Sequence, residues 1–314
     1  MSLVQRIIIM KYMKKFLGVS TMSLVKYEIF SKAAEVNSFT KTAEELGLTQ
    51  SAVSHAITSL EKEFNFPLFI RNNSAIKLTQ NGKDLLVTIR EILYYNDMLK
   101  QEVNAINGLN KGTVKVGVFS SISTNWIPYI IKEMEEKYPD IEIQLIEGNY
   151  AEIEKWLLES EVDCGFVNNK TTSLHSFDIV KLKTEPLLCV VSEQSPLHSN
   201  KHLSVEDIEN APFIMPTYQC FDDIQLFFKE NNIQPNIRFE NMNENSIFSM
   251  VENNLGISIL PEMIIPKGLD TIKVIPLELE QTRTIGLAIR RPVSPAVKKF
   301  AEISENWVKT WGLN

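Results

Sequence analysis

One stretch of the chain, residues 38–64, constrains the fold more than any other: SFTKTAEELGLTQSAVSHAITSLEKEF. Ser38 or Thr40 can cap a first helix, because a hydroxyl accepts from the unpaired amides of the first turn. Gly47 stands where the chain must reverse, and glycine adopts a positive φ without steric cost. Thr49 can cap a second helix. The apolar residues of that helix recur at three- and four-residue spacing and predict one buried stripe: Val53, Ala56, Ile57, Leu60 and Phe64.

The opposite face of the second helix carries short hydrogen-bonding side chains near its N-terminus: Gln50, Ser51, Ser54, His55 and Thr58. Recognition helices present such groups to base edges in the major groove of DNA. We expect Gln50, Ser51, Ser54 and His55 to approach bases, and Thr40 and Thr49 to contact phosphates. An ordinary antiparallel helix pair with a polar outer face explains the same pattern.

The segment that follows predicts a small β-hairpin. Residues 66–71 begin a strand, Asn72 and Asn73 supply turn chemistry, and residues 75–79 return. This hairpin carries Arg71 and Lys77, whose charges suit contacts with DNA phosphates. Thr79 can then cap a long helix that extends to about residue 107. A hairpin wing beside a helix pair favours DNA binding over the ordinary helix pair.

These elements together resemble the LysR-type transcriptional regulators. The residues that carry the resemblance span about 60 positions: Phe30, Ala33, Ala34, Ser38, Phe39, Thr40, Ala43, Leu46, Thr49, Gln50, Ser51, Ala52, Val53, Ser54, Leu60, Glu61, Pro67, Leu68, Phe69, Arg71, Leu78, Thr79 and Gly82. The family more often has Pro where Ser51 stands and Arg or a similar residue where His55 stands, which leaves the base preference open. The resemblance implies an α/β protein with an N-terminal winged helix-turn-helix, a long linker helix and a two-lobed, periplasmic-binding-protein-like effector domain.

The apolar residues of the predicted long helix alternate at four- and three-residue spacing, which is typical of a coiled-coil seam: Leu85, Ile89, Ile92, Leu99, Val103 and Ile106. Asn96 falls in the same register, where a polar residue fixes the pairing of two helices. Family members pair their subunits through this helix, so the resemblance implies a homodimer or homotetramer. A helix packed against its own domain is the alternative interpretation.

After Gly112, strands and helices alternate, which predicts βαβ units and a mainly parallel sheet. Expected strands cover 114–119, 141–146, 162–167, 187–191, 213–216, 237–239, 255–261 and 284–290. Expected helices cover 126–138, 150–159, 221–231, 244–253 and 295–310. We predict a DNA-binding domain at 22–80, a linker and dimerisation helix at 81–107 and an effector domain at 112–314. Lobe I of that domain is expected at about 112–183 and 284–314, and lobe II at about 184–283.

Ligands of α/β lobes bind at the carboxyl ends of the strands. The first such end, residues 120–125, is rich in hydroxyl groups and opens a helix, whose unpaired amides favour an anion. We therefore expect a small organic anion, such as a carboxylate or an amino acid, as effector. The residues expected to contact it are Ser120, Ser121, Asn149, Met215 and Thr217. Helix capping alone also explains Ser120 and Ser121. No other cofactor and no metal is expected.

The net charge of −7 divides unevenly along the chain. Residues 1–83 hold 11 Lys and Arg against 6 Asp and Glu, or +5, whereas residues 84–314 hold 21 against 33, or −12. A weakly basic end on an acidic body indicates DNA binding that depends on specific contacts and on dimerisation.

The apolar run in residues 1–21 is broken by four basic residues and is too interrupted to span a bilayer. We expect it to be an upstream start, or else an arm for DNA or a membrane surface.

Three cysteines, Cys164, Cys189 and Cys220, are too few and too scattered for a disulfide framework, which fits a reducing cytoplasm. Cys220 resembles, in position, the reactive cysteine of peroxide-sensing family members, but no second cysteine follows it closely.

The chain contains no GxSxG, GxGxxG, HExxH or CxxC motif, so we predict that it is not an enzyme. The sequence predicts a regulator that binds double-stranded DNA, with RNA polymerase as a further partner and no membrane partner. A small-solute-binding protein and a redox regulator acting through Cys220 are the alternatives.

Overall fold

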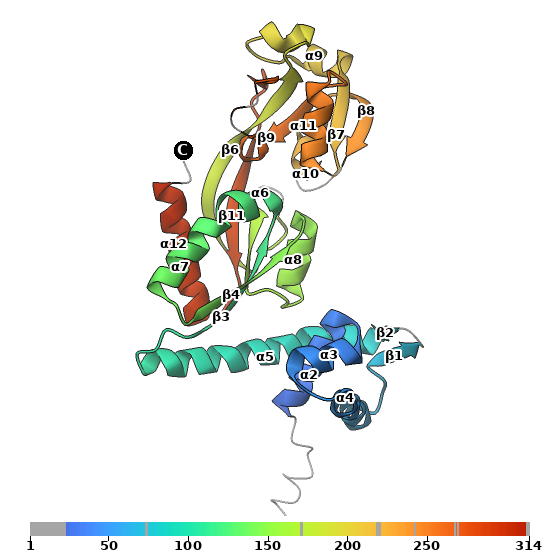
Figure 1. Ribbon diagram of the computed structural model, residues 1–314, viewed down its shortest axis with the longest axis vertical. Coiled ribbons are helices and arrows are strands. Elements are labelled where there is room, and N and C mark those ends of the chain that lie inside the picture. The colour runs from blue at the N-terminus through green and yellow to red at the C-terminus, as the bar shows by residue number, and fades with distance from the viewer. Residues whose placement is uncertain are drawn as a thin grey trace, which may run out of the picture. The chain divides into compact units, whose positions relative to one another are not determined.

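The computed structural model describes residues 23–72, 75–169, 172–217, 221–241, 243–266, 268 and 270–311 (Figure 1). The hypotheses for residues 1–21, Asn73 and Cys220 therefore concern positions outside the described residues. The chain divides into two compact units, one up to Leu99 and one from Lys100. This division falls within the long helix α5 (Gln80–Ile106).

The N-terminal unit contains a helical group followed by a hairpin. Its elements before α5 are α2 (Leu24–Val36), α3 (Phe39–Leu46), α4 (Gln50–Phe64), β1 (Phe69–Asn72) and β2 (Ala75–Leu78). Strands β1 and β2 pair in antiparallel register, as the turn residues between them predict. The helix α2 was not among the elements expected from the sequence, although Phe30 and Ala33 of this helix are fully buried in the core of the unit.

Local capping chemistry sets the bounds of α3 and α4. The hydroxyl of Ser38 accepts from Lys41 N, and the hydroxyl of Thr49 accepts from Ala52 N at 3.2 Å. Gly47 ends α3 with φ of +64°, a conformation that glycine adopts without strain. From Thr49 onward the predicted stripe faces inward, and Val53, for example, is completely buried. The predicted helix-turn-helix is therefore present.

The second unit consists of two lobes, each with its own hydrophobic core. We call lobe I the part built from β3 (Gly112–Val118), α6 (Ser120–Asn125), α7 (Ile127–Lys137), β4 (Ile141–Glu147), α8 (Tyr150–Leu158), β5 (Cys164–Asn168) and α12 (Pro295–Thr310). Lobe II contains η1 (Pro196–Ser199), α9 (Val205–Asn210), β7 (Pro212–Pro216), α10 (Phe221–Asn231), β8 (Asn236–Asn241), α11 (Glu244–Glu252), β9 (Ser258–Pro261), η2 (Glu262–Ile264) and β10 (Ile272–Pro276).

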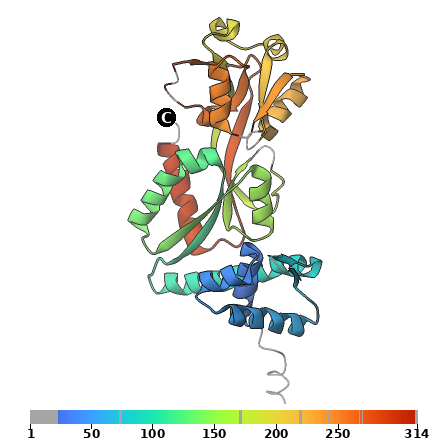
Figure 2. The same ribbon diagram turned by 45° about the vertical axis from the view of Figure 1, so that its right-hand side comes forward.

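Two long strands, β6 (Asp178–Ser192) and β11 (Thr282–Ile289), connect the lobes (Figures 1 and 2). The first part of β6 pairs with β11, and its last part pairs with β9 and β10 in lobe II. The main sheet therefore runs β10-β6-β11-β5-β3-β4, with β9 added on β6. In lobe I, α7 and α12 lie on one face of this sheet and α8 on the other (Figure 1).

The prediction of a mainly parallel sheet is wrong. Strands β3, β4 and β5 are parallel, as are β7 and β8, because helices connect β3 to β4, β4 to β5 and β7 to β8. Strands β6, β9, β10 and β11, however, form antiparallel ladders. Since β6 and β11 carry the chain in opposite directions between the lobes, they pair antiparallel, and the sheet is mixed.

Candidate functional site

The N-terminal end of α4 presents the polar side chains that the sequence predicts for base contacts. Gln50, Ser51 and His55 are exposed, and Ser54 is half-buried. The exposed hydroxyl of Thr49 lies 3.0 Å from that of Ser51. Thr40 is exposed in the first turn of α3. The side chains of Thr49, Gln50, Ser51, Ser54 and His55 form what we call the recognition face, which lies away from the buried stripe of α4.

The wing is tied to α4 by the carboxylate of Glu61. Its Oε1 accepts from the backbone N–H groups of Leu68 and Phe69 at 2.9 and 3.3 Å, and its Oε2 accepts from Arg71 Nη2 at 3.0 Å. Arg71 also donates to the hydroxyl of Thr58 at 3.3 Å. The predicted phosphate contact Arg71 is therefore held by α4, whereas Lys77 is exposed on β2. A guanidinium has five donors, so these bonds leave it able to bind a phosphate as well.

The predicted seam on α5 divides into two parts. Ile89 is 3% exposed in the core of the N-terminal unit, and Leu85 and Ile92 pack against that core. Here the alternative interpretation, a helix packed on its own domain, describes the contacts. Further along, Leu99 and Val103 are exposed, while Asn96 is half-buried. The apolar side chains of α5 that remain open to another molecule therefore lie toward its C-terminal end.

A buried ion pair lies where the two crossing strands run side by side. Arg283 on β11 stands opposite Glu185 on β6, and each is 1% exposed. Arg283 Nε donates to Glu185 Oε1. Its Nη1 donates to the hydroxyl oxygen of Tyr150 and its Nη2 to that of Ser121, both at 3.0 Å. The second oxygen of Glu185 accepts from Met263 N at 2.8 Å. The crossing strands thus carry a compensated charge pair that also holds two lobe I hydroxyls.

Two carboxylates of lobe II reach into the same region. Asp223 on α10 is 4% exposed and accepts from Asn168 Nδ2 and from the hydroxyl of Tyr150, the latter at 3.3 Å. Ser120 Oγ lies 3.5 Å from a carboxylate oxygen of Glu244 on α11. Together with Arg283, Glu185 and Ser121, these residues form what we call the interlobe network. Its described charged members are one arginine and three carboxylates.

Burial shifts the proton affinity of these carboxylates. It raises the pKa of Asp223 to about 6, although the charge of Arg283 and the hydrogen bonds from Asn168 and Tyr150 lower it. Burial likewise raises the pKa of Glu244. Each lobe II carboxylate is therefore ionised at a cost that its lobe I partners only partly offset.

The predicted effector contacts have different environments. Ser120 and Ser121 belong to the interlobe network. Asn149 caps α8, where its side chain accepts from Glu152 N at 2.9 Å in a reciprocal capping box. Met215 is 1% exposed in the core of lobe II, and Thr217 is half-buried just after β7. Residues 120–125 form a short helix of their own, α6, and the helix expected at 126–138 follows as α7.

Sequence reasoning missed most of the network. Arg283 and Glu185 both lie in strands, but their pairing depends on a register between residues 98 positions apart in the sequence. A weak signal existed for Asp223, which lies four residues before Phe227 and so on the buried face of α10.

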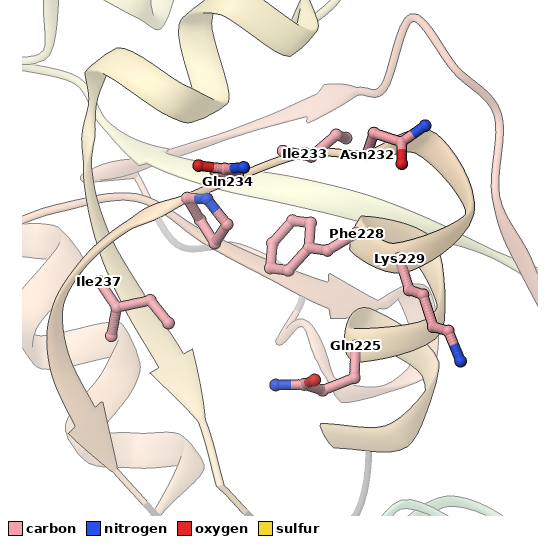
Figure 3. Close-up of a pocket in the computed structure, with 8 residues that line it drawn as sticks. Gln225, Phe228, Lys229, Asn232, Ile233, Gln234 and Ile237 are labelled. Carbon is pink, nitrogen blue, oxygen red and sulfur yellow. The ribbon is translucent and has the colours of Figure 1, made fainter.

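A separate pocket of about 400 Å³ lies on lobe II, between α10, the segment after it and β8 (Figure 3). Its described lining residues are Gln225, Phe228, Lys229, Asn232, Ile233, Gln234, Pro235 and Ile237. Phe228 and Ile237 give it an apolar side, and Lys229 is the charged member of this set (Figure 3). This lining is distinct from the interlobe network and from the predicted effector contacts.

Other candidate features of the described residues are two cysteines, possible metal ligands and possible membrane-spanning helices. Burial raises the pKa of the Cys164 and Cys189 thiols, which disfavours their reactive thiolate forms. Within the described ranges, no group of three or more His, Cys, Asp or Glu side chains is placed to hold a metal ion. Over the same part of the chain, no helix combines the length and apolar character needed to cross a membrane.

Comparison with known proteins identifies the family. Residues 24–83 match the family model described as bacterial regulatory helix-turn-helix protein, lysR family, and residues 107–308 match the LysR substrate binding domain. The chain is 32% identical over 285 residues to an uncharacterized HTH-type transcriptional regulator, YvbU of Bacillus subtilis (strain 168), with 90% of this chain and 94% of the relative covered.

Solved structures share the fold. A cysteine-to-aspartate variant of full-length OxyR from Pseudomonas aeruginosa superposes with a TM-score of 0.74 at 20% identity, covering 92% of this chain and 95% of that one. The effector binding domain of QuiR in complex with shikimate gives a TM-score of 0.56 at 22% identity, covering 64% of this chain and 99% of that one.

The chain therefore belongs to the LysR family of bacterial transcriptional regulators. It combines a DNA-binding helix-turn-helix domain with a domain that binds a small-molecule effector. Its homologues are transcriptional regulators and not enzymes. This membership favours the predicted regulator over the alternative of a solute-binding protein.

The pKa of Asp223 predicts a specific dependence of stability on pH. The folded state holds the proton of the Asp223 carboxyl more tightly than the unfolded state does. The stability that this proton contributes is therefore fully present below about pH 4 and is lost as pH rises through about 6. Relative to Asp223→Asn, the wild-type free energy of unfolding should fall by about 1 kcal/mol between pH 5 and pH 7.5. Urea unfolding at the two pH values measures this difference. A difference that stays constant with pH would show that Asp223 titrates normally.

Proposed function

We propose that this regulator binds a pseudo-palindromic operator through paired recognition faces and wings. The observation that carries the proposal is the exposure of Gln50, Ser51 and His55 at the N-terminal end of α4, where a recognition helix meets base edges. In this proposal Ser54 also approaches a base. Thr40, Thr49, Arg71 and Lys77 hold phosphates and set the orientation on the duplex. Two half-sites about one helical turn apart follow from two-fold pairing.

The proposed assembly is a homodimer or homotetramer. The exposed apolar residues Leu99 and Val103 on α5 support pairing through the C-terminal part of the helix, beside Asn96. Leu85, Ile89 and Ile92 contribute in this proposal by fixing the helix to its own domain. RNA polymerase is the further partner, and the cytoplasm is the proposed location.

We retain the domain limits of 22–80, 81–107 and 112–314 as proposals, with lobe I at about 112–183 and 284–314 and lobe II at about 184–283. The two family-model matches, at 24–83 and 107–308, support an N-terminal and a C-terminal domain separated by α5.

The proposed effector is a small organic anion bound between the lobes. Donor groups support an anion there, since Tyr150, Asn168 and Arg283 all present N–H or O–H groups to the interlobe region. Ser120, Ser121, Asn149, Met215 and Thr217 remain the proposed contacts from the sequence. Effector binding would favour one arrangement of the subunits by binding it more tightly than the other. A redox role for Cys220, which lies outside the described residues, is an alternative.

Base recognition and phosphate contact predict different effects on DNA binding. With an operator selected from random DNA, Gln50→Ala should cost about 1–3 kcal/mol on the operator and far less on unrelated DNA, because a base contact is lost. Lys77→Ala should weaken binding to the operator and to unrelated DNA to a similar extent, because a phosphate contact is lost. The slope of log affinity against log salt concentration should become shallower by about one released counterion. Fluorescence anisotropy across a salt series measures both effects. Equal losses on both DNAs for Gln50→Ala would contradict the assignment.

The charge of the effector can be tested separately. Calorimetric titration with a panel of small carboxylates and their uncharged amides should find at least one carboxylate that binds and whose amide does not. The reason is that an uncharged amide forms weaker hydrogen bonds with the donors than a carboxylate does. Binding of uncharged compounds alone would show that the effector is not an anion.

A further inference from the structure

Asp223 makes an unusual crossing between the lobes. It belongs to α10 of lobe II, but its carboxylate accepts hydrogen bonds from two lobe I side chains, Asn168 on β5 and Tyr150 at the start of α8. All three side chains are at least 95% buried. The neighbouring Asp222 on the same helix is exposed, so α10 carries one carboxylate in these contacts and one open to solvent.

The donors around Asp223 are held by other parts of the protein. The hydroxyl of Tyr150 accepts from Arg283 Nη1 at 3.0 Å, and its ring packs edge-on against Phe119 with centroids 5.0 Å apart. Arg283 is in turn fixed by Glu185 and Ser121. Because these contacts do not involve Asp223, Tyr150 and Arg283 should keep their positions when its carboxylate is absent, and the pairing of β5 with β11 holds the backbone of Asn168.

We call Asn168, Tyr150 and Arg283 the cradle, and its chemistry matches a carboxylate. An ionised carboxyl group accepts several hydrogen bonds through two oxygens, and here Oδ1 accepts from an amide while Oδ2 accepts from a phenol. The positive charge of Arg283 adds an attraction for the ionised form. The cradle is thus built for one carboxylate, and the chain supplies it from the opposite lobe.

We propose that Asn168, Tyr150 and Arg283 form the subsite for the carboxylate of the effector, and that Asp223 occupies this subsite as a tethered substitute. The proposal rests on the proposed function only in taking the effector to be an organic anion. An effector would then bind by displacing Asp223, since two carboxylates in one buried site repel each other. Displacement would release a contact between the lobes, which gives ligand binding a direct effect on lobe arrangement.

Chemical rescue with acetate tests this proposal on the full chain. Asp223→Ala removes the tethered carboxylate and leaves the cradle donors in place, so free acetate should bind there. The control variant is Asp222→Ala, which removes an exposed carboxylate from the same helix. Sodium chloride at equal ionic strength controls for general salt effects. Asp223→Ser provides a second variant with a small side chain in case the alanine variant does not fold.

The expected result is a rise in melting temperature of about 2–4 °C for the Asp223 variants at an acetate concentration about five times its Kd. Wild type and Asp222→Ala should not respond, because the cradle is filled. No acetate response in either Asp223 variant, or an equal response in all four proteins, would overturn the proposal. That result would leave operator binding and the calorimetric search for an anionic effector unaffected, because both use the wild-type chain.

Discussion

The interlobe region depends on one buried ion pair, Arg283 with Glu185. A charge in this position is tolerated only when a partner compensates for its lost hydration. The antiparallel register of β6 and β11 supplies that partner directly opposite, at the place where both strands pass between the lobes. The remaining donors of Arg283 then fix Ser121 and Tyr150, so one charge pair organises hydroxyls from two helices of lobe I.

The N-terminal unit could be predicted well from the sequence because its signals are local. Ser38 and Thr49 cap their helices through amides three residues away, and Gly47 ends α3 in the left-handed conformation. A resemblance of about 60 residues added the family, which the comparisons confirm. The helix α2 was missed because its residues Phe30 and Ala33 were used only as part of the family resemblance, and no helix was predicted from their spacing.

The second unit could be predicted only in outline. Helices such as α10 and α12 have the bounds that their apolar spacing indicated. The antiparallel part of the sheet was missed, because it depends on pairing between residues about one hundred positions apart. The interlobe network has the same origin: the spacing within α10 places Asp223 on its buried face, but the partners of Asp223 depend on what lobe I places against that helix. The roles of the predicted effector and DNA contacts remain predictions.

A double-mutant cycle on Arg283→Met and Glu185→Leu tests the central claim most directly. Urea unfolding of the full chain should show that each single variant loses about 3–5 kcal/mol, because it leaves one uncompensated buried charge. The double variant should lose much less than the sum of the two. Losses that add to within about 0.5 kcal/mol would contradict the account, because independent effects would mean that the pair does not organise the region.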